Sequence, residues 1–508
     1  MRTAANVLAN FVGRVSNTLI SLAVVPLYLE AMGREGFGLV GLFTSLQVIQ
    51  TVLDAGLGLE MSRRLARLFV DADPNADEIG DVIRTFGTMF ASMGLLVLAL
   101  TTLAAPWVAT SWVRAETLPT SQVRDAMLVV GVYLALLWPS AMLNTILSAA
   151  ERQGVLNAIA TTASILRAVV TVMVLWWVEP TPRAFAAVQV LVTLITLGAL
   201  TLAVRNMLPR RSRRPRFRGD VLRASWVTSA STVSITLLQI GISQTDRIVL
   251  SRTLPLAELG VYTLAFSLAA NLHAFITPIY AAYFPRFCRT VGTDVPATRE
   301  AFLEGSRAMA VIVLPPAITL AAFSRETLHA WTGDAELADA AAGPLTALAL
   351  GYAVAALHHV PQAMQYASGW LRPQILATGV ATVGGIAWFA LATRHVPLSV
   401  LAGGWLGMNT LILVAAAPVA VRRFAPGTEG TVTADLSFVA VLVAVGVGLA
   451  RLVPFGSSRL ESGVAVGVGA ACSLIAVGLA MGLRPWGRTW FERARAAAQR
   501  RFGQAKTS

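Results

Sequence analysis

Apolar stretches of roughly 20 residues recur along the whole 508-residue chain, and they constrain its fold more than any other feature. Each stretch is long enough to cross the roughly 30 Å hydrocarbon layer of a bilayer as a helix. Hydrophobic residues make up 56% of the chain and charged residues only 13%, about half the usual share of a soluble domain. The sequence therefore predicts an all-α integral membrane protein.

The apolar stretches divide into about 14 predicted transmembrane helices. They lie at 9–31, 37–60, 84–109, 125–148, 155–178, 182–207, 225–250, 258–283, 307–330, 341–366, 372–394, 397–421, 433–453 and 461–483. An even number places both termini on one side of the membrane. Of the 40 Lys and Arg residues, 28 fall on that side, nine on the other and three within spans. This bias predicts cytoplasmic termini in a multi-pass protein of the cell inner membrane.

Several classes of protein are disfavoured by composition. Two cysteines are too few for a disulfide framework, and the five histidines show no metalloprotease spacing. The net charge of +13 lies in loops and tails, where membrane topology explains it better than nucleic-acid binding does. The predicted external loops have at most about 17 residues, too few for a catalytic domain, whereas a polysaccharide polymerase or ligase would need a sizeable one. We therefore expect a protein that is not an enzyme, with no cofactor and no metal.

The predicted organisation has five parts. Residues 1–207 form an N-terminal six-helix bundle, 208–222 a basic cytoplasmic loop, and 223–424 a second six-helix bundle. Helices thirteen and fourteen occupy 425–485, and residues 486–508 read as a basic amphipathic tail on the anionic inner leaflet.

An internal repeat relates the two bundles. One face of the first predicted helix carries a polar stripe made of Asn10, Arg14, Asn17 and Ser21. Adding 222 to each number gives Thr232, Thr236, Gln239 and Ser243 on the seventh helix. The same offset pairs Gly38 with Gly260. Two halves of six helices each imply a parallel repeat about an axis along the membrane normal. The stripes predict a water-filled substrate cavity, although Ser and Thr also occur on closely packed helix faces.

Several segments together resemble a known family. They are GREGFGL at Gly33–Leu39, LDAGLGLEMSRRLAR at Leu53–Arg67, AERQGVLN at Ala150–Asn157 and QTDRIVLSRTLPLAELGVY at Gln244–Tyr262. In order and spacing they resemble polysaccharide and lipid-linked oligosaccharide flippases (Wzx-type) of the multidrug/oligosaccharidyl-lipid/polysaccharide exporter superfamily. The resemblance implies two bundles around a V-shaped central cavity, plus two extra C-terminal helices. It also implies alternating access, with an isoprenoid diphosphate carrying an oligosaccharide as cargo.

Charged residues inside predicted spans are functional candidates because they are costly in lipid. Arg167, about twelve residues into the fifth helix, and Arg14 suit a diphosphate or an acidic sugar in the cavity. A structural pairing of Arg167 with a neighbouring helix, and snorkelling of Arg14 to the cytoplasmic face, stay open as alternatives. Gln47 belongs to the cavity set and shares a face of the second helix with Asp54.

A second group of residues is assigned to coupling or gating. Asp54 is a candidate for proton or cation coupling, or for pairing with nearby arginines. Asp246 and Arg247 are adjacent near the outer end of the seventh helix, where we expect a gate contact and a separate partner for each. His358 and His359 could carry a coupling proton or could simply be packed.

The leading hypothesis is a flippase that translocates an undecaprenyl-diphosphate-linked oligosaccharide across the cytoplasmic membrane for surface polysaccharide biosynthesis. The alternatives are a flippase for the peptidoglycan lipid precursor and a cation-coupled multidrug exporter of the same superfamily. The expected partners are membrane lipid, the lipid-linked oligosaccharide, and the polysaccharide polymerase and glycosyltransferases of the same pathway. The expected coupling ions are protons or sodium ions.

Overall fold

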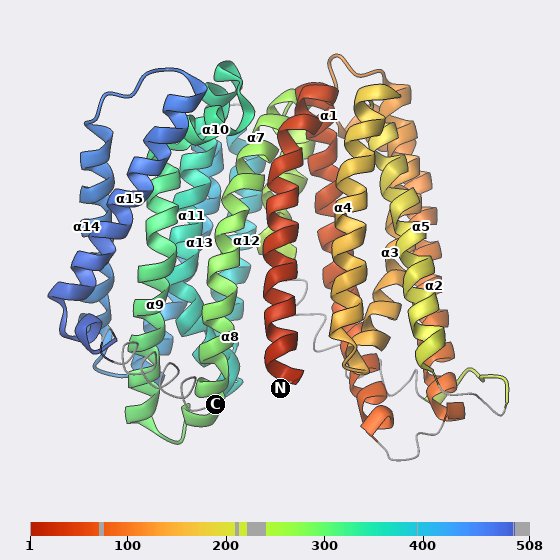
Figure 1. Cartoon of the computed structure of the whole chain (residues 1–508), viewed down its shortest axis with the longest axis horizontal. Helices are drawn as coiled ribbons and strands as arrows, with labels where there is room; N and C mark the ends of the chain where they lie inside the picture. Colours follow the sequence, from red (N-terminus) through yellow and green to blue (C-terminus); the bar gives the residue numbers. More distant parts are fainter. Residues whose placement is uncertain are drawn as a thin grey trace, which may run out of the picture. The chain divides into compact units, whose positions relative to one another are not determined.

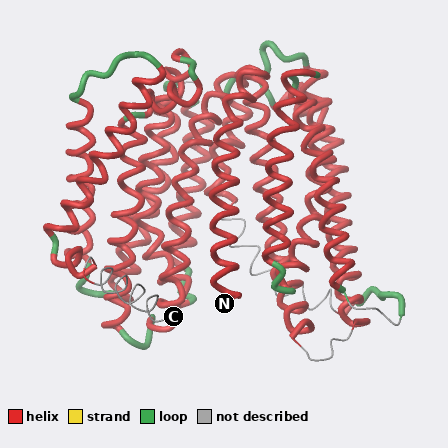
Figure 2. Tube along the Cα trace, viewed as in Figure 1, coloured by secondary structure: helices red, strands yellow, loops and turns green. Residues whose placement is uncertain are grey.

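The fold was analysed in a computed structural model that describes residues 2–70, 76–208, 213–220, 240–393, 395–490 and 492. Within these ranges, the side chains of residues 2–19, 21, 51–56 and 70 lie outside the described part. The described residues are almost entirely helical (Figures 1 and 2). A bilayer core offers no water to unpaired backbone groups, so helices are the form that apolar segments take when they span it.

The helices follow one another with short connections. In chain order they are α1 (Arg2–Val70), α2 (Ala76–Trp107) with a π-helical end (Val108–Trp112), α3 (Thr120–Ala149), α4 (Gln153–Trp177), α5 (Pro182–Met207), α7 (Leu256–Ala269), α8 (His273–Thr290), α9 (Val295–Ala322), α10 (Ser324–Thr332), α11 (Ala335–Ser368), α12 (Arg372–Ala392), α13 (Leu398–Phe424), α14 (Glu429–Arg451) and α15 (Arg459–Leu483). Residues 240–253 are also helical. Among the described residues, 11 helical segments are long and apolar enough to span a membrane. The all-α membrane architecture is thus confirmed, and the count of about 14 spans stays a prediction.

Two predicted spans differ in detail from the structure. The one at 258–283 is interrupted by a 3-10 turn at Ala270–Leu272, where the Asn271 side chain donates a hydrogen bond to the Ser267 carbonyl and competes with the backbone. The one at 307–330 ends earlier, at Ala322, and α10 begins separately at Ser324.

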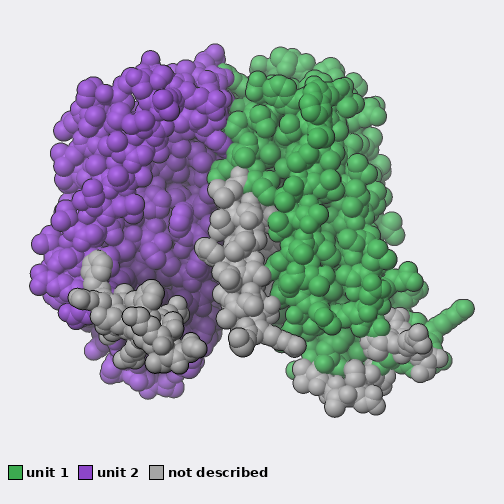
Figure 3. Space-filling view, viewed as in Figure 1, with its two compact units in different colours: residues 1–264, 389–393 green, residues 265–388, 394–508 purple. Residues whose placement is uncertain are grey.

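The chain forms two compact units, coloured separately in Figure 3. Unit 1 comprises residues 1–264 and 389–393, and unit 2 comprises residues 265–388 and 394–508. In unit 1, helices α2, α3 and α5 pack on aromatic side chains that include Phe86, Phe90 and Trp138. In unit 2, helices α8, α9, α11 and α13 enclose Phe287, Phe302 and other apolar side chains.

Within unit 2, a buried carboxylate connects helices α14 and α15 to α9. Asp435 of α14 pairs with Arg307 of α9 at 2.7 Å and with Arg484, just after α15, at 3.4 Å. Removing one partner of such a buried cluster leaves an uncompensated charge, so this contact holds the extra helix pair in place.

A glycine marks the junction between the first two predicted spans. Helix α1 is broken at Gly33, whose φ of 72° and ψ of 177° are accessible almost only to glycine. Two residues later, the Glu35 carboxylate accepts hydrogen bonds from three successive backbone N–H groups, those of Glu116 (3.0 Å), Thr117 (3.0 Å) and Leu118 (2.9 Å). We call these three hydrogen bonds the Glu35 clamp. The Glu35 clamp connects the break in α1 to the loop that precedes α3.

The Glu35 clamp gives the fold a pH dependence. Burial alone would raise the pKa of Glu35, but the N–H groups of Leu118, Glu116 and Thr117 outweigh burial and lower the pKa. A lowered folded-state pKa stabilises the protein above the unfolded-state pKa of about 4.3, and this stabilisation is lost as pH falls through the folded-state value. At pH 7, we expect Glu35→Gln to lower the free energy of unfolding by roughly 1–2 kcal/mol.

Unfolding of both proteins in mixed micelles at pH 7 and at progressively lower pH measures this effect. The difference in the free energy of unfolding between wild type and Glu35→Gln should become smaller below about pH 4. A difference that stays constant with pH would contradict the role given to the ionised carboxylate.

Two glycines of unit 1 that the predicted repeat pairs lie in contact. A Cβ atom on Gly38 would overlap the carbonyl oxygen of Leu256, and one on Gly260 would overlap the carbonyl oxygen of Arg34. The offset of 222 exchanges Gly38 with Gly260 and Arg34 with Leu256. The crossing of α1 and α7 is therefore reciprocal, and it brings two backbones as close as glycine permits.

Gly38→Ala and Gly260→Ala should each lower the free energy of unfolding by roughly 1–3 kcal/mol, because the new methyl group displaces a backbone carbonyl. The double variant should lose less than the sum, since one separation of the two helices relieves both overlaps. Gly198→Ala, where a Cβ meets open space, is the control and should not be destabilising. Additive losses would argue against a shared contact.

Candidate functional site

An arginine inside unit 1 is held by neutral side chains from neighbouring helices. Arg167 of α4 is half-buried, and its Nη1 donates hydrogen bonds to the Tyr133 hydroxyl of α3 (3.2 Å) and to Gln189 Oε1 of α5 (3.0 Å). The guanidinium carbon also lies 5.8 Å from the centre of the Tyr133 ring, within cation–π range. Three helices thus fix the position of one positive charge.

The cluster around Arg167 extends through two buried side chains. Gln189 Nε2 donates to the Thr171 hydroxyl at 3.4 Å, one helical turn along α4 from Arg167. Tyr28 of α1 reaches the same place, where its hydroxyl is hydrogen-bonded with Thr171. We call Tyr28, Tyr133, Arg167, Thr171 and Gln189 the Arg167 cluster. It connects four helices of the unit through polar groups alone.

The Arg167 cluster contains no acidic residue. Among the described residues, no carboxylate forms an ion pair with Arg167, whereas Arg307 and Arg213 each have an aspartate. Neutral hydrogen bonds orient a guanidinium without cancelling its charge, and an uncancelled charge in a low-dielectric region attracts an anion strongly. Arg167 has further donors beyond Nη1, in the fork geometry that matches phosphate and carboxylate. The arrangement is suited to binding an anionic group.

Many of the other predicted cavity side chains cannot be compared with the structure. The side chains of Asn10, Arg14, Asn17, Ser21 and Asp54, and the whole of Thr232, Thr236 and Gln239, lie outside the described residues. Of the remaining cavity candidates, Gln47 is half-buried and is not free of partners. The Ser243 carbonyl accepts a hydrogen bond from Arg247 Nη2 (3.1 Å).

Asp246 and Arg247 are both buried, and each has its own partner. Asp246 accepts a hydrogen bond of 2.6 Å from the Tyr262 hydroxyl of α7, and Arg247 donates one of 2.7 Å to Gln244 Oε1 on its own helix. Both contacts lie within unit 1. The Asp246 contact connects the helical stretch 240–253 to α7, and the Arg247 contact lies within that stretch. The role of both residues in gating stays a prediction.

The two predicted coupling histidines lie in unit 2. His358 is buried, and its Nε2 is 3.3 Å from Asn409 Oδ1 of α13, while His359 is half-buried and its Nδ1 is 2.6 Å from the Ala355 carbonyl. Their rings are stacked with centroids 4.9 Å apart. They form a polar group separate from the Arg167 cluster.

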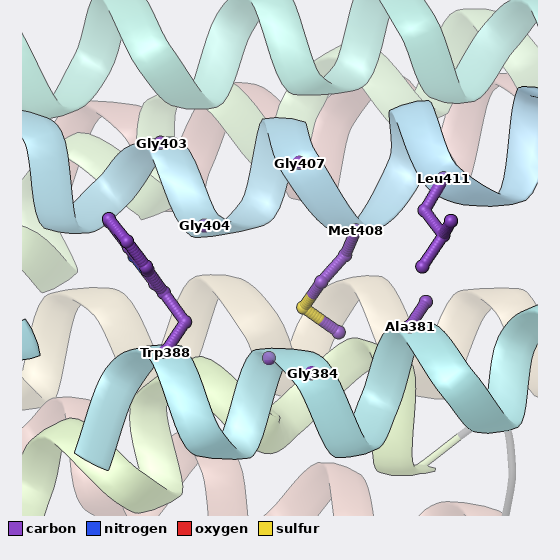
Figure 4. Close-up of a pocket in the computed structure, with 9 residues that line it drawn as sticks. Ala381, Gly384, Trp388, Gly403, Gly404, Gly407, Met408 and Leu411 are labelled. Carbon is purple, nitrogen blue, oxygen red and sulfur yellow. The ribbon is translucent and has the colours of Figure 1, made fainter. Parts of the chain in front are cut away.

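A groove between α12 and α13 has a different character. It has a volume of about 330 Å³, and glycine and alanine positions line its walls together with the apolar side chains of Trp388, Met408 and Leu411 (Figure 4). The lining residues are Ala381, Gly384, Gly385, Trp388, Gly403, Gly404, Gly407, Met408 and Leu411. With no charged group in this lining, the groove is not suited to holding a diphosphate, and the Arg167 cluster remains the candidate site for an anion.

Sequence reasoning identified Arg167 but not the residues that hold it. Thr171 shares a helix face with Arg167, and the helical spacing of four residues predicts that the two are neighbours. Gln189 is an amide in the middle of an apolar stretch, eight residues into the span, and that rarity is a usable signal. Tyr28 and Tyr133 gave no such signal, because an aromatic hydroxyl in a span is equally typical of packing.

The fold is that of a multi-pass membrane protein. The solved structure of the lipid II flippase MurJ in an inward closed conformation is similar over 94% of this chain and 98% of its own length, with a TM-score of 0.69 at 10% identity. An inward-facing multidrug resistance MATE family transporter of the MOP superfamily is similar over 83% of this chain and 95% of its own length, with a TM-score of 0.59 at 17% identity. These likenesses establish the shared fold.

The family follows from the sequence. Residues 3–291 match the model of a family described as polysaccharide biosynthesis protein. No curated protein matches the sequence. The match covers more than half of the chain, so the protein belongs to the polysaccharide biosynthesis protein family. This family membership agrees with the resemblance to polysaccharide flippases noted from the sequence, and the fold is shared with a solved transporter of the MOP superfamily.

The Arg167 cluster makes a measurable energetic prediction. In a double-mutant cycle of Arg167→Met and Gln189→Leu, followed by reversible unfolding in mixed micelles, we expect a coupling free energy of about 0.6–1.7 kcal/mol. The range is modest because the unfolded helices also find polar partners in a micelle. A cycle of Arg167→Met with Gln47→Leu, also in unit 1, is the control and should give a value near zero. Equal couplings in both cycles would show that the substitutions act through general destabilisation.

Proposed function

We propose that the protein is a flippase that translocates an undecaprenyl-diphosphate-linked oligosaccharide across the cytoplasmic membrane by alternating access, in the biosynthesis of a surface polysaccharide. The observation that carries the proposal is Arg167, a cation held among membrane-spanning helices by Tyr133 and Gln189 with no carboxylate partner among the described residues. A diphosphate is the part of this cargo that most resists entering lipid, and it is also the part that a guanidinium binds best.

The family membership supports a role in polysaccharide synthesis, and the arginine supports an anionic cargo. The protein would lie in the cell inner membrane with both termini in the cytoplasm, where the excess of basic residues falls. Its partners would be the glycosyltransferases that build the lipid-linked sugar and the polymerase that consumes it. Coupling to protons or sodium ions would drive the cycle.

A peptidoglycan precursor flippase is the second candidate, because the lipid II flippase MurJ has a similar fold and the same diphosphate chemistry would suit Arg167. A cation-coupled multidrug exporter is less well supported, since cationic drugs call for acidic side chains, and the Arg167 cluster has none. Rescue of cells depleted of their own lipid II flippase would favour the second candidate over the first.

The test is transport of undecaprenyl-diphosphate-linked oligosaccharide in proteoliposomes. Arg167→Gln should reduce the rate at least about tenfold, because a hydrogen bond to a charged group contributes roughly 1.5–3 kcal/mol. Arg167→Lys should retain part of the activity, since the charge remains and the fork is lost. Arg183→Gln removes an exposed arginine at the start of α5 and serves as the charge-matched control. Wild-type protein that is folded but no faster than empty vesicles would refute the proposal.

A further inference from the structure

Three histidines of unit 2 lie close together. His358 and His359 lie on α11, with ring centroids 4.9 Å apart, and His273 at the start of α8 lies 5.9 Å from the His359 ring. Their exposure falls in steps: His273 is exposed, His359 is half-buried and His358 is only 6% exposed. A graded series of imidazoles thus leads from the surface of the unit into its interior.

The hydrogen bonds indicate which ring nitrogens carry protons. Asn409 Nδ2 donates to the Trp405 carbonyl at 2.9 Å, which turns Asn409 Oδ1, an acceptor, toward His358 Nε2. The Ala355 carbonyl is likewise an acceptor for His359 Nδ1. Both histidines therefore donate through these nitrogens. In the neutral form, the other nitrogen of His358, Nδ1, is then a buried acceptor that has no partner among the described residues.

Among the described residues, no hydrogen bond or ion pair joins the three rings to a charged side chain. The titratable side chain with a ring contact to the three histidines is Tyr280 on α8, whose ring lies 6.5 Å from that of His359. Of the helices packed against α11, residues 308–323 of α9 and 398–421 of α13 contain no titratable side chain. Of the charged residues nearer the ends of α8 and α9, Arg286 is paired with Glu304 at 2.9 Å and Arg307 with Asp435 at 2.7 Å. The charged residues of α10 are engaged elsewhere, Arg325 with Asp339 and Glu326 with Arg451.

We propose that His273, His358 and His359 form a binding site for a single coupling proton, which enters at His273 and is accepted at the free Nδ1 of His358. The inference deepens the proposed function and rests on it, because it names the ion and the residues that would drive transport. Two imidazolium rings within 5 Å in a low-dielectric interior repel each other, so the site holds one proton at a time. In the described part of the chain, no carboxylate is bonded to any of the three rings to stabilise a second proton.

A proton fits this site better than a metal ion. Hard cations such as sodium are bound by several oxygen ligands, whereas the groups presented here are ring nitrogens. Across the described part of the chain, no group of three or more His, Cys, Asp or Glu side chains is arranged to hold a metal. Histidine chains in membrane helices are typical of proton relays.

Partly exposed polar groups continue from the site along α11. Gln362 and Tyr366 follow His359 at spacings of three and seven residues on the same helix face, and Gln362 Nε2 donates to the Tyr366 hydroxyl at 3.3 Å. They offer hydroxyl and amide groups beside the imidazoles through which water could reach them.

The first experiment needs no cargo. Purified wild-type protein carrying ¹⁵N-labelled histidine is titrated by NMR while circular dichroism monitors folding. We expect the three clustered histidines to take up one proton in total, and His358→Gln and His359→Gln to abolish that uptake. His395→Gln, which alters an exposed histidine outside the cluster, should leave it unchanged. Independent protonation of all three rings, or no protonation while the protein stays folded, would overturn the single-proton site.

The second experiment links the site to transport. In proteoliposomes, a pH gradient should accelerate translocation of the lipid-linked oligosaccharide by wild-type protein several-fold. His358→Gln and His359→Gln should transport at the gradient-free rate with and without the gradient, whereas His395→Gln should respond like wild type. Variants that keep the full response would overturn the proton-coupling role. Failure of wild-type protein to transport in either condition would instead count against the proposed function, and it would leave the titration result standing.

Discussion

The position of one positive charge among apolar helices underlies the functional interpretation of this protein. An arginine in a membrane span is costly, and a fold keeps it only where hydrogen bonds offset part of that cost. Here Tyr133 and Gln189 supply those bonds from two neighbouring helices, and neither carries charge. The guanidinium is thereby oriented without being neutralised. An aspartate in the place of Gln189 would have made Arg167 a structural ion pair, as Asp435 does for Arg307.

The lipid surroundings also explain the contacts that organise each unit. Where α1 breaks at Gly33, the Glu35 carboxylate gathers three backbone N–H groups of a neighbouring loop. Where α1 crosses α7, glycine allows two backbones to touch, because apolar side chains gain little by associating in lipid and close packing must supply the contact. In unit 2, Asp435 and its two arginines fasten the last helix pair. Polar groups at helix breaks and ends, and small residues at helix crossings, thus hold the helices together in addition to their apolar packing.

The two units carry different chemistry. Unit 1 holds the Arg167 cluster, which is cationic and oriented by neutral groups, and unit 2 holds three imidazoles that no charged side chain among the described residues pairs with. Anion binding and proton binding would thus be separated between units. A transporter that binds cargo in one place and a driving ion in another needs the two sites to favour the same conformations, and linkage between them is then reciprocal.

The sequence by itself determined the class of protein. Repeated apolar stretches require membrane helices, because nothing else satisfies the backbone in lipid. It also pointed to Arg167, since a charge in such a stretch is visible without coordinates, and its flippase-like motifs agreed with the family match. Only the tertiary structure decided that Arg167 meets Tyr133 and Gln189 rather than a carboxylate, and that His273 joins His358 and His359. These side chains belong to helices whose relative rotation is set by packing, and packing between segments distant in sequence leaves little trace in helical periodicity.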